Sequence, residues 1–229
     1  MTQPANPPDS GDQPLSPADS LALIDAQQAA RARRGLLSAA LMWGVWGFVY
    51  LISFGAFYLA QKGILSEFVA GILTAVLMVG AIVFSAVFGV RSGHGVRGPS
   101  QVVGAMYGCS WPLGFMVLTA VNVGLQNTGL TADQVTLLWS GSVLLLAGVL
   151  FMAGGALLRN WVQYGLGAWT MITGAGSIYA GVPGNFLVLS LAGGGGFLVL
   201  AGFYTWRALR ASGPGRVGSG PLGINVPAL

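Results

Sequence analysis

The chain has 229 residues, of which 54% are hydrophobic and only 7% are charged. A soluble domain has about 25% charged residues, so this composition excludes an ordinary water-facing surface. The hydrophobic residues form long charge-free blocks between short loops, which is typical of a membrane protein. The net charge of +4 does not indicate nucleic-acid binding, because the arginines lie at the ends of the apolar blocks.

A short helix is predicted over residues 16–34. Ser16 is a favourable N-cap, and Pro17 suits the first helical position. Three arginines follow at the end of the segment, where the helix dipole favours positive charge. Leu21 and Ile24 share one face, so we expect an amphipathic surface helix that leads into the first membrane span; a helix that docks a partner protein is the alternative.

Both ends of the chain are predicted to be flexible. Residues 1–15 contain four prolines and no aromatic residue, which indicates a disordered tail. Residues 211–229 are rich in glycine and have one charged residue, Arg216.

Six apolar blocks predict an all-α membrane domain over residues 36–206. A helix needs about 20 residues to cross a hydrocarbon core of roughly 30 Å. Each block reaches that length without Asp, Glu, Lys, Arg or His, and none alternates as a barrel strand does. The predicted spans are 36–60, 68–90, 102–125, 136–158, 161–180 and 186–206.

The basic residues predict the orientation. With six spans both termini lie on one side of the membrane, and that side receives every arginine, whereas the other side receives only Lys62. Loops with this excess of positive charge face the cytoplasm. We therefore expect a multi-pass protein of the plasma membrane with cytoplasmic termini. Its arginines are Arg31, Arg33, Arg34, Arg91, Arg97, Arg159, Arg207, Arg210 and Arg216.

The residue inventory argues against an enzyme. The only histidine, His94, is predicted to lie in a cytoplasmic loop, and the single cysteine, Cys109, allows no intramolecular disulfide. Zinc-site spacings, a serine-hydrolase elbow and a phosphate-binding P-loop are absent from the sequence. No span contains the carboxylate or base that an intramembrane protease needs. We therefore expect no catalytic residues, no metal and no cofactor.

Glycine and proline inside the spans indicate either close helix packing or local weakness. Small residues let membrane helices approach one another, but consecutive glycines also weaken a helix. The last block has such a run, so packing and hinge interpretations both remain open there. Pro112 is expected to loosen or kink the third span. The run consists of Gly193, Gly194, Gly195 and Gly196.

Three tryptophans are predicted to lie deep in the membrane. Trp46, Trp111 and Trp169 follow the cytoplasmic ends of three parallel spans by about 8–10 residues, or roughly 12–15 Å. Each indole N–H needs a partner at that depth. They either pack separately against neighbouring helices or converge on a ligand cavity, with Ser142 and Thr173 as its neutral polar groups.

Three stretches resemble a poorly characterised family of glycine- and alanine-rich six-span membrane proteins from high-GC bacteria. They are SPADSLALI at 16–24, the Tyr-Gly-x-x-Trp motif at 107–111, and GGGGF at 193–197. Members of that family are often labelled transporter or permease, so the resemblance implies a transport component.

The layout also resembles the membrane subunits of ABC-2 type exporters. Those subunits have six spans, cytoplasmic termini, a surface helix before the first span and a cytoplasmic loop that couples to an ATPase; residues 91–99 would form that loop here. The layout departs from that family at residues 181–185, where re-entrant helices are missing.

Two function classes follow from these patterns. The first is a transport component for a neutral or amphipathic small molecule, because the spans contain no charge to bind an ion. The second is a non-transporting sensor, scaffold or accessory subunit. The expected partners are the lipid bilayer and either a cytoplasmic ATPase subunit or further copies of the chain.

Overall fold

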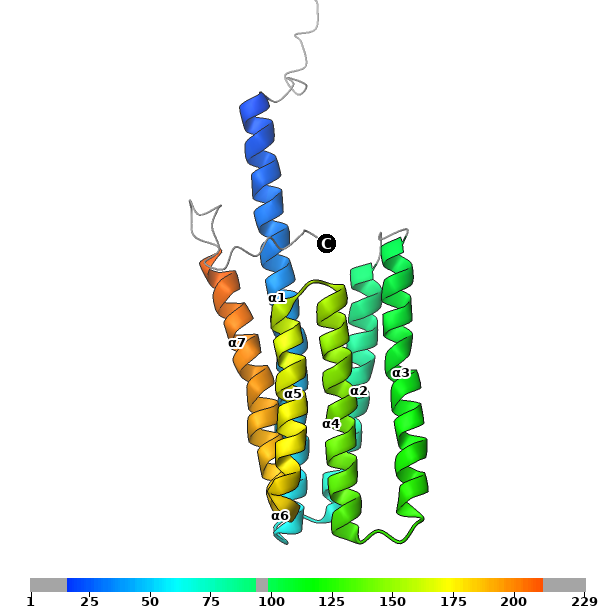
Figure 1. Cartoon of the computed structure of the whole chain (residues 1–229). Coiled ribbons are helices and arrows are strands. Elements are labelled where there is room, and N and C mark those ends of the chain that lie inside the picture. Colours follow the sequence, from blue (N-terminus) through cyan, green and yellow to red (C-terminus); the bar gives the residue numbers. More distant parts are fainter. Residues whose placement is uncertain (1–15, 94–98, 212–229) are drawn as a thin grey trace, which may run out of the picture.

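The computed structural model describes residues 16–93 and 99–211, and this part of the chain is helical throughout except for short connections. The predicted tails and the loop around His94 lie outside the described residues, apart from Ala211. The helices run approximately parallel to one axis (Figure 1). They are α1 (Pro17–Gln61), α2 (Glu67–Gly93), α3 (Pro99–Gln126), α4 (Ala132–Leu157), α5 (Trp161–Tyr179), α6 (Gly181–Val188), the π-helix η1 (Leu189–Gly194) and α7 (Gly195–Arg210).

Five helices are long and apolar enough to cross a membrane. Within the described residues they are Pro17–Gln61, Glu67–Arg91, Val102–Gln126, Ala132–Leu157 and Gly181–Arg210. The fifth predicted span corresponds to α5, which has 19 residues and is not among these five. The structure therefore has five to six long apolar helices.

The first helix begins as the sequence predicts. The Ser16 hydroxyl oxygen accepts a hydrogen bond from the backbone N–H of Asp19 at 3.1 Å, and Pro17 occupies the first turn. No break separates the predicted surface helix from the predicted first span, because α1 continues through Gly35 to Gln61 as one helix of 45 residues. The isolated glycine at position 35 lowers helix propensity, but the good helix formers around it keep the helix intact.

This continuous helix projects beyond the other helices at the end of the bundle where α7 terminates (Figure 1). Leu21, Leu23 and Ile24 lie on the projecting part and are exposed. The apolar face that these residues form is therefore not covered by any other described residue. Its role as the membrane-binding face of an amphipathic surface helix stays a prediction.

Side chains that cap the helices explain two other boundaries. Thr131 and Gln134 form a capping box at the start of α4, in which each side chain bonds the other residue's backbone N–H. The Asn160 side chain accepts hydrogen bonds from the backbone N–H groups of Val162 and Gln163, both at 3.1 Å, at the start of α5. These caps fix the positions at which the chain reverses direction.

The last apolar helix begins earlier than predicted and is interrupted. Residues 181–185 were expected to form an outward loop, but α6 already begins at Gly181 and contains non-helical backbone at Val182 (φ −89°, ψ 131°). The π-helix Leu189–Gly194 then separates α6 from α7. The last helix therefore has three sections rather than the single uniform helix that hydropathy alone indicates.

The main core lies where α1, α4, α5, η1 and α7 meet. Tyr50, Leu144, Leu166, Leu189 and Phe197 form its buried cluster. Phe197 is at its centre, with ring centroids 5.3 Å from Tyr50 and 5.8 Å from Phe151. Helices α2 and α3 are peripheral: α2 packs against α1, and α3 packs against α4.

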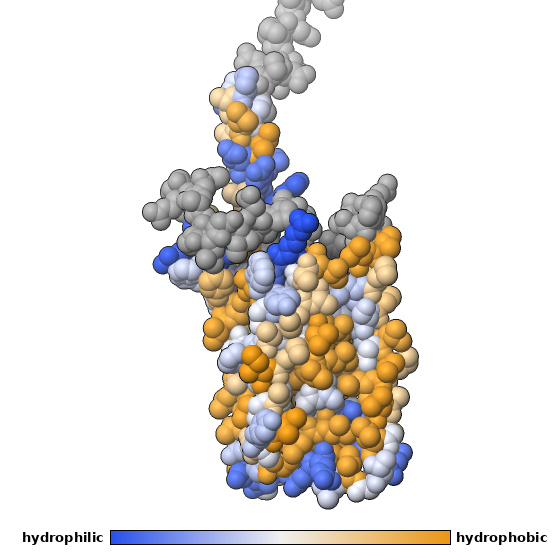
Figure 2. All heavy atoms as spheres, viewed as in Figure 1, coloured by the Kyte–Doolittle hydropathy of each residue, from blue (hydrophilic) through white to orange (hydrophobic). Residues whose placement is uncertain are grey.

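Outside this core the surface of the bundle is apolar. Figure 2 shows hydrophobic residues covering the sides of the bundle and hydrophilic residues at its lower end and on the projecting part of α1. Phe68, Val76 and Val90 on α2 and Met106 and Met116 on α3 are all exposed. Exposed hydrophobic surface of this extent is consistent with a membrane location.

Candidate functional site

The glycine run lies at the junction between the π-helix and α7. Gly193 and Gly194 end η1, and Gly195 and Gly196 begin α7. A π-helix shifts the hydrogen-bond register of a helix locally and occurs frequently at functional sites. The junction therefore combines an irregular section of helix with glycines, which have low helix propensity.

The glycines of the run lie in different surroundings. A Cβ on Gly194 would lie 2.7 Å from the Leu51 nitrogen and 3.0 Å from the Gly47 oxygen, so this glycine allows α1 to approach η1 closely. Around Gly195 there is nothing within 4 Å of such a Cβ. Gly194 is thus a packing position, whereas Gly195 is a position where only helix propensity matters.

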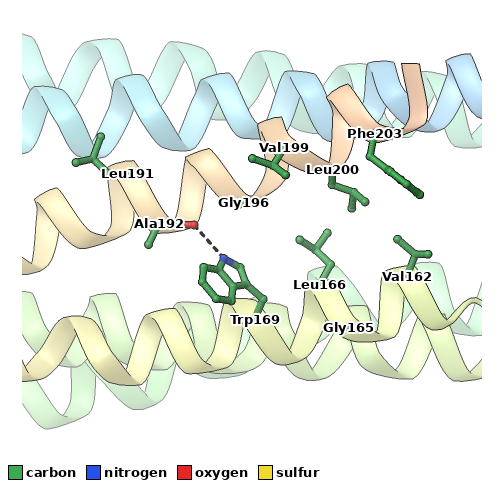
Figure 3. A pocket seen from close by; sticks show the side chains of 10 residues that line it. All are labelled: Val162, Gly165, Leu166, Trp169, Leu191, Ala192, Gly196, Val199, Leu200 and Phe203. Atoms are coloured by element: carbon green, nitrogen blue, oxygen red, sulfur yellow. Dashed lines mark hydrogen bonds between the residues drawn. The ribbon is translucent and has the colours of Figure 1, made fainter. Parts of the chain in front are cut away.

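Trp169 on α5 contacts the same junction. Its indole N–H donates a hydrogen bond to the Ala192 carbonyl oxygen of η1 at 3.0 Å (Figure 3). A Cβ on Gly196 would lie 2.5 Å from the Trp169 Nε1 atom, so a larger residue there would displace the indole. The tryptophan therefore joins α5 to the interrupted helix.

An apolar groove of about 520 Å³ lies beside Trp169, between α5 and the last helix. Figure 3 shows Trp169, Leu166 and Val162 on one wall and Leu191, Val199 and Phe203 on the other. Trp169 is the only lining residue with a polar side-chain group, and its N–H is already bonded. The remaining lining residues are Gly165, Ala192, Gly196 and Leu200.

The other two deep tryptophans do not line this groove. The Trp46 indole N–H donates to the Ser85 hydroxyl oxygen on α2 at 3.1 Å, and the Trp46 ring lies 6.3 Å from the Tyr50 ring. Trp111 stacks on Phe115, with ring centroids 6.1 Å apart, and contacts Phe151 at 5.1 Å.

The three indoles therefore have separate packing partners, which is one of the two alternatives that the sequence leaves open. Equal depth along parallel helices does not determine the direction in which each indole points, and the packing partners differ for each helix. Trp46 points to α2 and Trp111 contacts α4, whereas Trp169 contacts η1. Ligand binding by any one of the three stays a prediction.

The predicted polar groups also make separate local contacts. The Ser142 hydroxyl donates to the Leu138 carbonyl oxygen at 2.6 Å and accepts a hydrogen bond from the Asn122 amide at 2.8 Å. Thr173 is buried on α5, and its methyl carbon would lie 3.9 Å from a Cβ on Gly193. Ser142 thus joins α3 to α4, and Thr173 lies beside the glycine run.

Pro112 lies inside α3, which continues on both sides of it. A proline ring crowds the carbonyl of the residue four positions earlier, and here that residue is Gly108, which has no side chain to add to the crowding. The helix therefore tolerates the proline without ending.

Sequence reasoning missed Asn185, which it placed in a loop. Asn185 is wholly buried in α6. Its amide donates to the Ser140 hydroxyl oxygen at 3.2 Å, and its Oδ1 atom has no hydrogen-bond partner. The Ser53 hydroxyl on α1 is also buried and without a partner. The sequence did contain one signal for this residue, an asparagine directly before a long apolar block. The start of α6 at Gly181, which places Asn185 inside the helix, could not be recognised from the sequence.

Buried hydroxyl groups accompany Asn185 in the same bundle. Ser190 on η1 donates to the Leu51 carbonyl oxygen of α1 at 2.8 Å, and Ser177 on α5 donates to the Gly174 oxygen at 2.7 Å. All these groups are uncharged. Among the described residues, no group of three His, Cys, Asp or Glu side chains is arranged to hold a metal ion.

The interrupted helix thus presents neutral hydrogen-bonding groups inside an apolar bundle, and one of them, the Asn185 oxygen, is unsatisfied. Comparison of the chain with protein-family models, with curated proteins and with solved structures finds no match.

Proposed function

We propose that this chain is a six-span protein of the bacterial plasma membrane with both termini in the cytoplasm, and that it is a transport component for a neutral or amphipathic small molecule. A permease acting alone and the membrane subunit of an ABC system both fit this description.

The packing of α5 supports its role as a membrane span, in addition to the five longer apolar helices. A Cβ on Gly155, near the end of α4, would lie 2.5 Å from the Tyr164 nitrogen near the start of α5. At the opposite ends of the two helices a Cβ on Gly141 would lie 2.7 Å from the Ile178 Cδ1 atom. The two helices therefore run antiparallel along almost their whole length, so a membrane that contains α4 also contains α5.

The position of the charges supports the orientation. Arg91, Arg207 and Arg210 lie in the last turns of α2 and α7, and these helix ends point the same way as the projecting part of α1 (Figure 1). Lys62 and Glu67 lie at the opposite end of the bundle, between α1 and α2. Arginine-rich ends are typical of the cytoplasmic side.

The observation that favours transport is the buried Asn185 on an interrupted helix. Transporters commonly bind substrate at helices with irregular sections, where backbone and side-chain polar groups face a cavity. A buried amide oxygen without a partner costs about 1–3 kcal/mol. A substrate hydroxyl or amide that donated to this oxygen would remove that cost, and the absence of charged groups in the described spans favours a neutral substrate.

Replacement of Asn185 by leucine tests the proposal. We expect a folded protein of similar thermal stability, because removal of the unsatisfied oxygen offsets loss of the hydrogen bond to Ser140, but loss of transport. The measurement is the energy-dependent accumulation of a panel of neutral amphipathic dyes, including N-phenyl-1-naphthylamine, in membrane vesicles that contain the protein.

Asn122→Leu is the matched control for this experiment. Asn122 is also buried, but its amide donates to Ser142, so its loss should lower stability without selectively removing transport. Accumulation of every dye at the rate of vesicles without the protein would contradict the transport proposal, whereas full activity of Asn185→Leu would contradict the role of Asn185 in binding the substrate.

An accessory subunit is the second candidate, and the exposed face of α3 favours it. Gly104 and Gly108 have GxxxG spacing, and a Cβ on either would meet nothing within 4 Å. This spacing lets a second membrane helix approach closely. Gly108→Ile should then abolish co-purification of a partner or of a second tagged copy, whereas Gly71→Ile on α2 should not.

A further inference from the structure

We propose that the groove between α5 and the last helix binds one acyl chain of an anionic phospholipid, whose phosphate lies at Arg207 and Arg210. This inference rests on the membrane placement proposed above but not on transport. It follows from the position of the groove, from its lining and from the charges at one of its ends.

The groove is open at the surface that the bundle presents to the membrane. The exposed fractions of its lining side chains are 74% for Val199, 59% for Leu191 and 45% for Trp169. An occupant would therefore enter from the bilayer rather than from water. Residues 162–169 of α5 line one wall, and they span about 10 Å along the helix, which is most of one leaflet of the hydrocarbon core.

The lining suits a hydrocarbon chain. The ten lining residues are aliphatic, aromatic or glycine, and the N–H of Trp169 is bonded to Ala192. A polar solute would leave its hydrogen-bonding groups unpaired in this groove, whereas an acyl chain has none to satisfy. Gly165 leaves room beside this lining, because a Cβ there would meet nothing within 4 Å.

The charges at one end of the groove select the headgroup. Phe203 lines that end, and the Arg207 guanidinium lies 5.8 Å from its ring centroid. One turn along α7, the Arg210 guanidinium lies 4.0 Å over the Trp206 ring. Neither α5 nor α7 contains a carboxylate. Two guanidinium groups on aromatic rings, without an acidic neighbour on either helix, provide donors for a phosphate.

The distribution of lining and charge therefore matches the two parts of one amphipathic molecule. The apolar groove lies in the membrane-facing part of α5 and α7, and the arginines follow it in the last turn of α7. On the cytoplasmic side that we propose for this end, anionic lipids combine acyl chains with a phosphate and a net negative charge.

Native mass spectrometry of the full chain tests the inference, with dioleoyl phosphatidylglycerol and dioleoyl phosphatidylcholine added separately to protein in mild detergent. We expect one tightly retained phosphatidylglycerol and roughly thirtyfold weaker retention of phosphatidylcholine, as two basic side chains at a lipid surface provide. Equal retention of the two lipids, or retention of neither, would overturn the proposal.

Gly165→Leu tests the groove itself. A Cβ at this position meets nothing within 4 Å, so the leucine side chain extends into the groove without displacing the backbone. Retention of both lipids should fall at least tenfold. Gly176→Leu is the matched control, because this glycine lies on the same helix, also has open space around it and does not line the groove. Equal retention by the two variants would contradict the proposal.

Arg207→Gln tests the headgroup contact separately. Retention of phosphatidylglycerol should fall about fivefold, because Arg210 remains, and retention of phosphatidylcholine should not change. Arg31→Gln on the projecting part of α1 should have no effect. Val199→Phe narrows the groove from the other wall and replaces Gly165→Leu if that variant fails to fold. Because the readout is lipid retention, a negative dye-transport result would leave this inference standing, and loss of lipid retention would leave the transport proposal standing.

Discussion

Gly194 and Gly195 are neighbours in the chain that lie in opposite surroundings. Gly194 faces the backbone of α1 at Gly47 and Leu51, whereas Gly195 faces open space, although both have helical backbone angles. At the residue scale, one run of identical residues thus contains a glycine that allows close helix packing and a glycine that only lowers helix propensity.

Alanine at the two positions should therefore change stability in opposite directions. Gly194→Ala places a methyl group against the Leu51 nitrogen and should destabilise the bundle by about 1–3 kcal/mol through overpacking. Gly195→Ala should stabilise it by about 0.4–1 kcal/mol, because alanine loses less backbone entropy on folding. Melting temperatures in mild detergent distinguish these outcomes, and a shift of the same sign in both variants would contradict the assignment.

At the element scale, α4 and α5 form the closest helix pair. Gly141, Gly148 and Gly155 on α4 recur every seven residues, and Gly167 and Gly174 on α5 have the same spacing. A seven-residue repeat keeps one face of a helix towards its partner, so a row of glycines brings the two backbones together. The Gly148 oxygen would lie 2.6 Å from a Cβ on Gly167.

Substitution at the centre of this contact should separate the two helices. Gly148→Ala brings a methyl group against the Gly167 oxygen and the Met171 side chain, and we expect a loss of about 1–3 kcal/mol. Gly176→Ala on α5 has open space and should be neutral or slightly stabilising. Unfolding in detergent titrated with sodium dodecyl sulfate measures both, and equal effects would argue against close packing at Gly148.

The continuity of α1 gives a second prediction at this scale. A continuous helix protects the bonds after Arg31, Arg33 and Arg34 from trypsin. Gly35→Pro should raise cleavage after Arg31 and Arg33 about tenfold or more, because proline inside a helix costs about 3 kcal/mol and cleavage follows the opened fraction. The bond after Arg34 then precedes a proline and resists trypsin. Gly35→Ala is the control and should reduce cleavage. Rapid cleavage of the unmodified chain, as measured by mass spectrometry of the fragments, would indicate that the helix is broken near Gly35.

At the scale of the whole molecule, hydropathy and capping residues predicted most of the helices. The Ser16 N-cap and the apolar blocks of α2, α3 and α4 were located within a few residues, because each depends on local sequence. The early start of α6 and the π-helix were not predictable, since each depends on packing against other helices. The continuity of α1 depends instead on the good helix formers around Gly35. The directions in which Trp46, Trp111 and Trp169 point could not be predicted because they too depend on packing against other helices, whereas the seven-residue glycine spacing was present in the sequence and was overlooked.

In the proposed topology, the bundle crosses the membrane six times and both ends lie on the arginine-rich side. Single cysteines in a Cys109→Ser background test it at four exposed positions. Ile64 and Tyr179 lie at one end of the bundle, on the α1–α2 connection and at the end of α5, and Leu21 and Leu209 lie at the other end, on α1 and α7.

The most direct measurement is labelling of these four variants with a membrane-impermeant maleimide, in intact cells and after permeabilisation. The account predicts that cysteines replacing Ile64 and Tyr179 react in intact cells, and that cysteines replacing Leu21 and Leu209 react only after permeabilisation. An odd number of spans would place Leu21 and Leu209 on opposite sides of the membrane. Labelling of just one of these two positions in intact cells would therefore contradict the account.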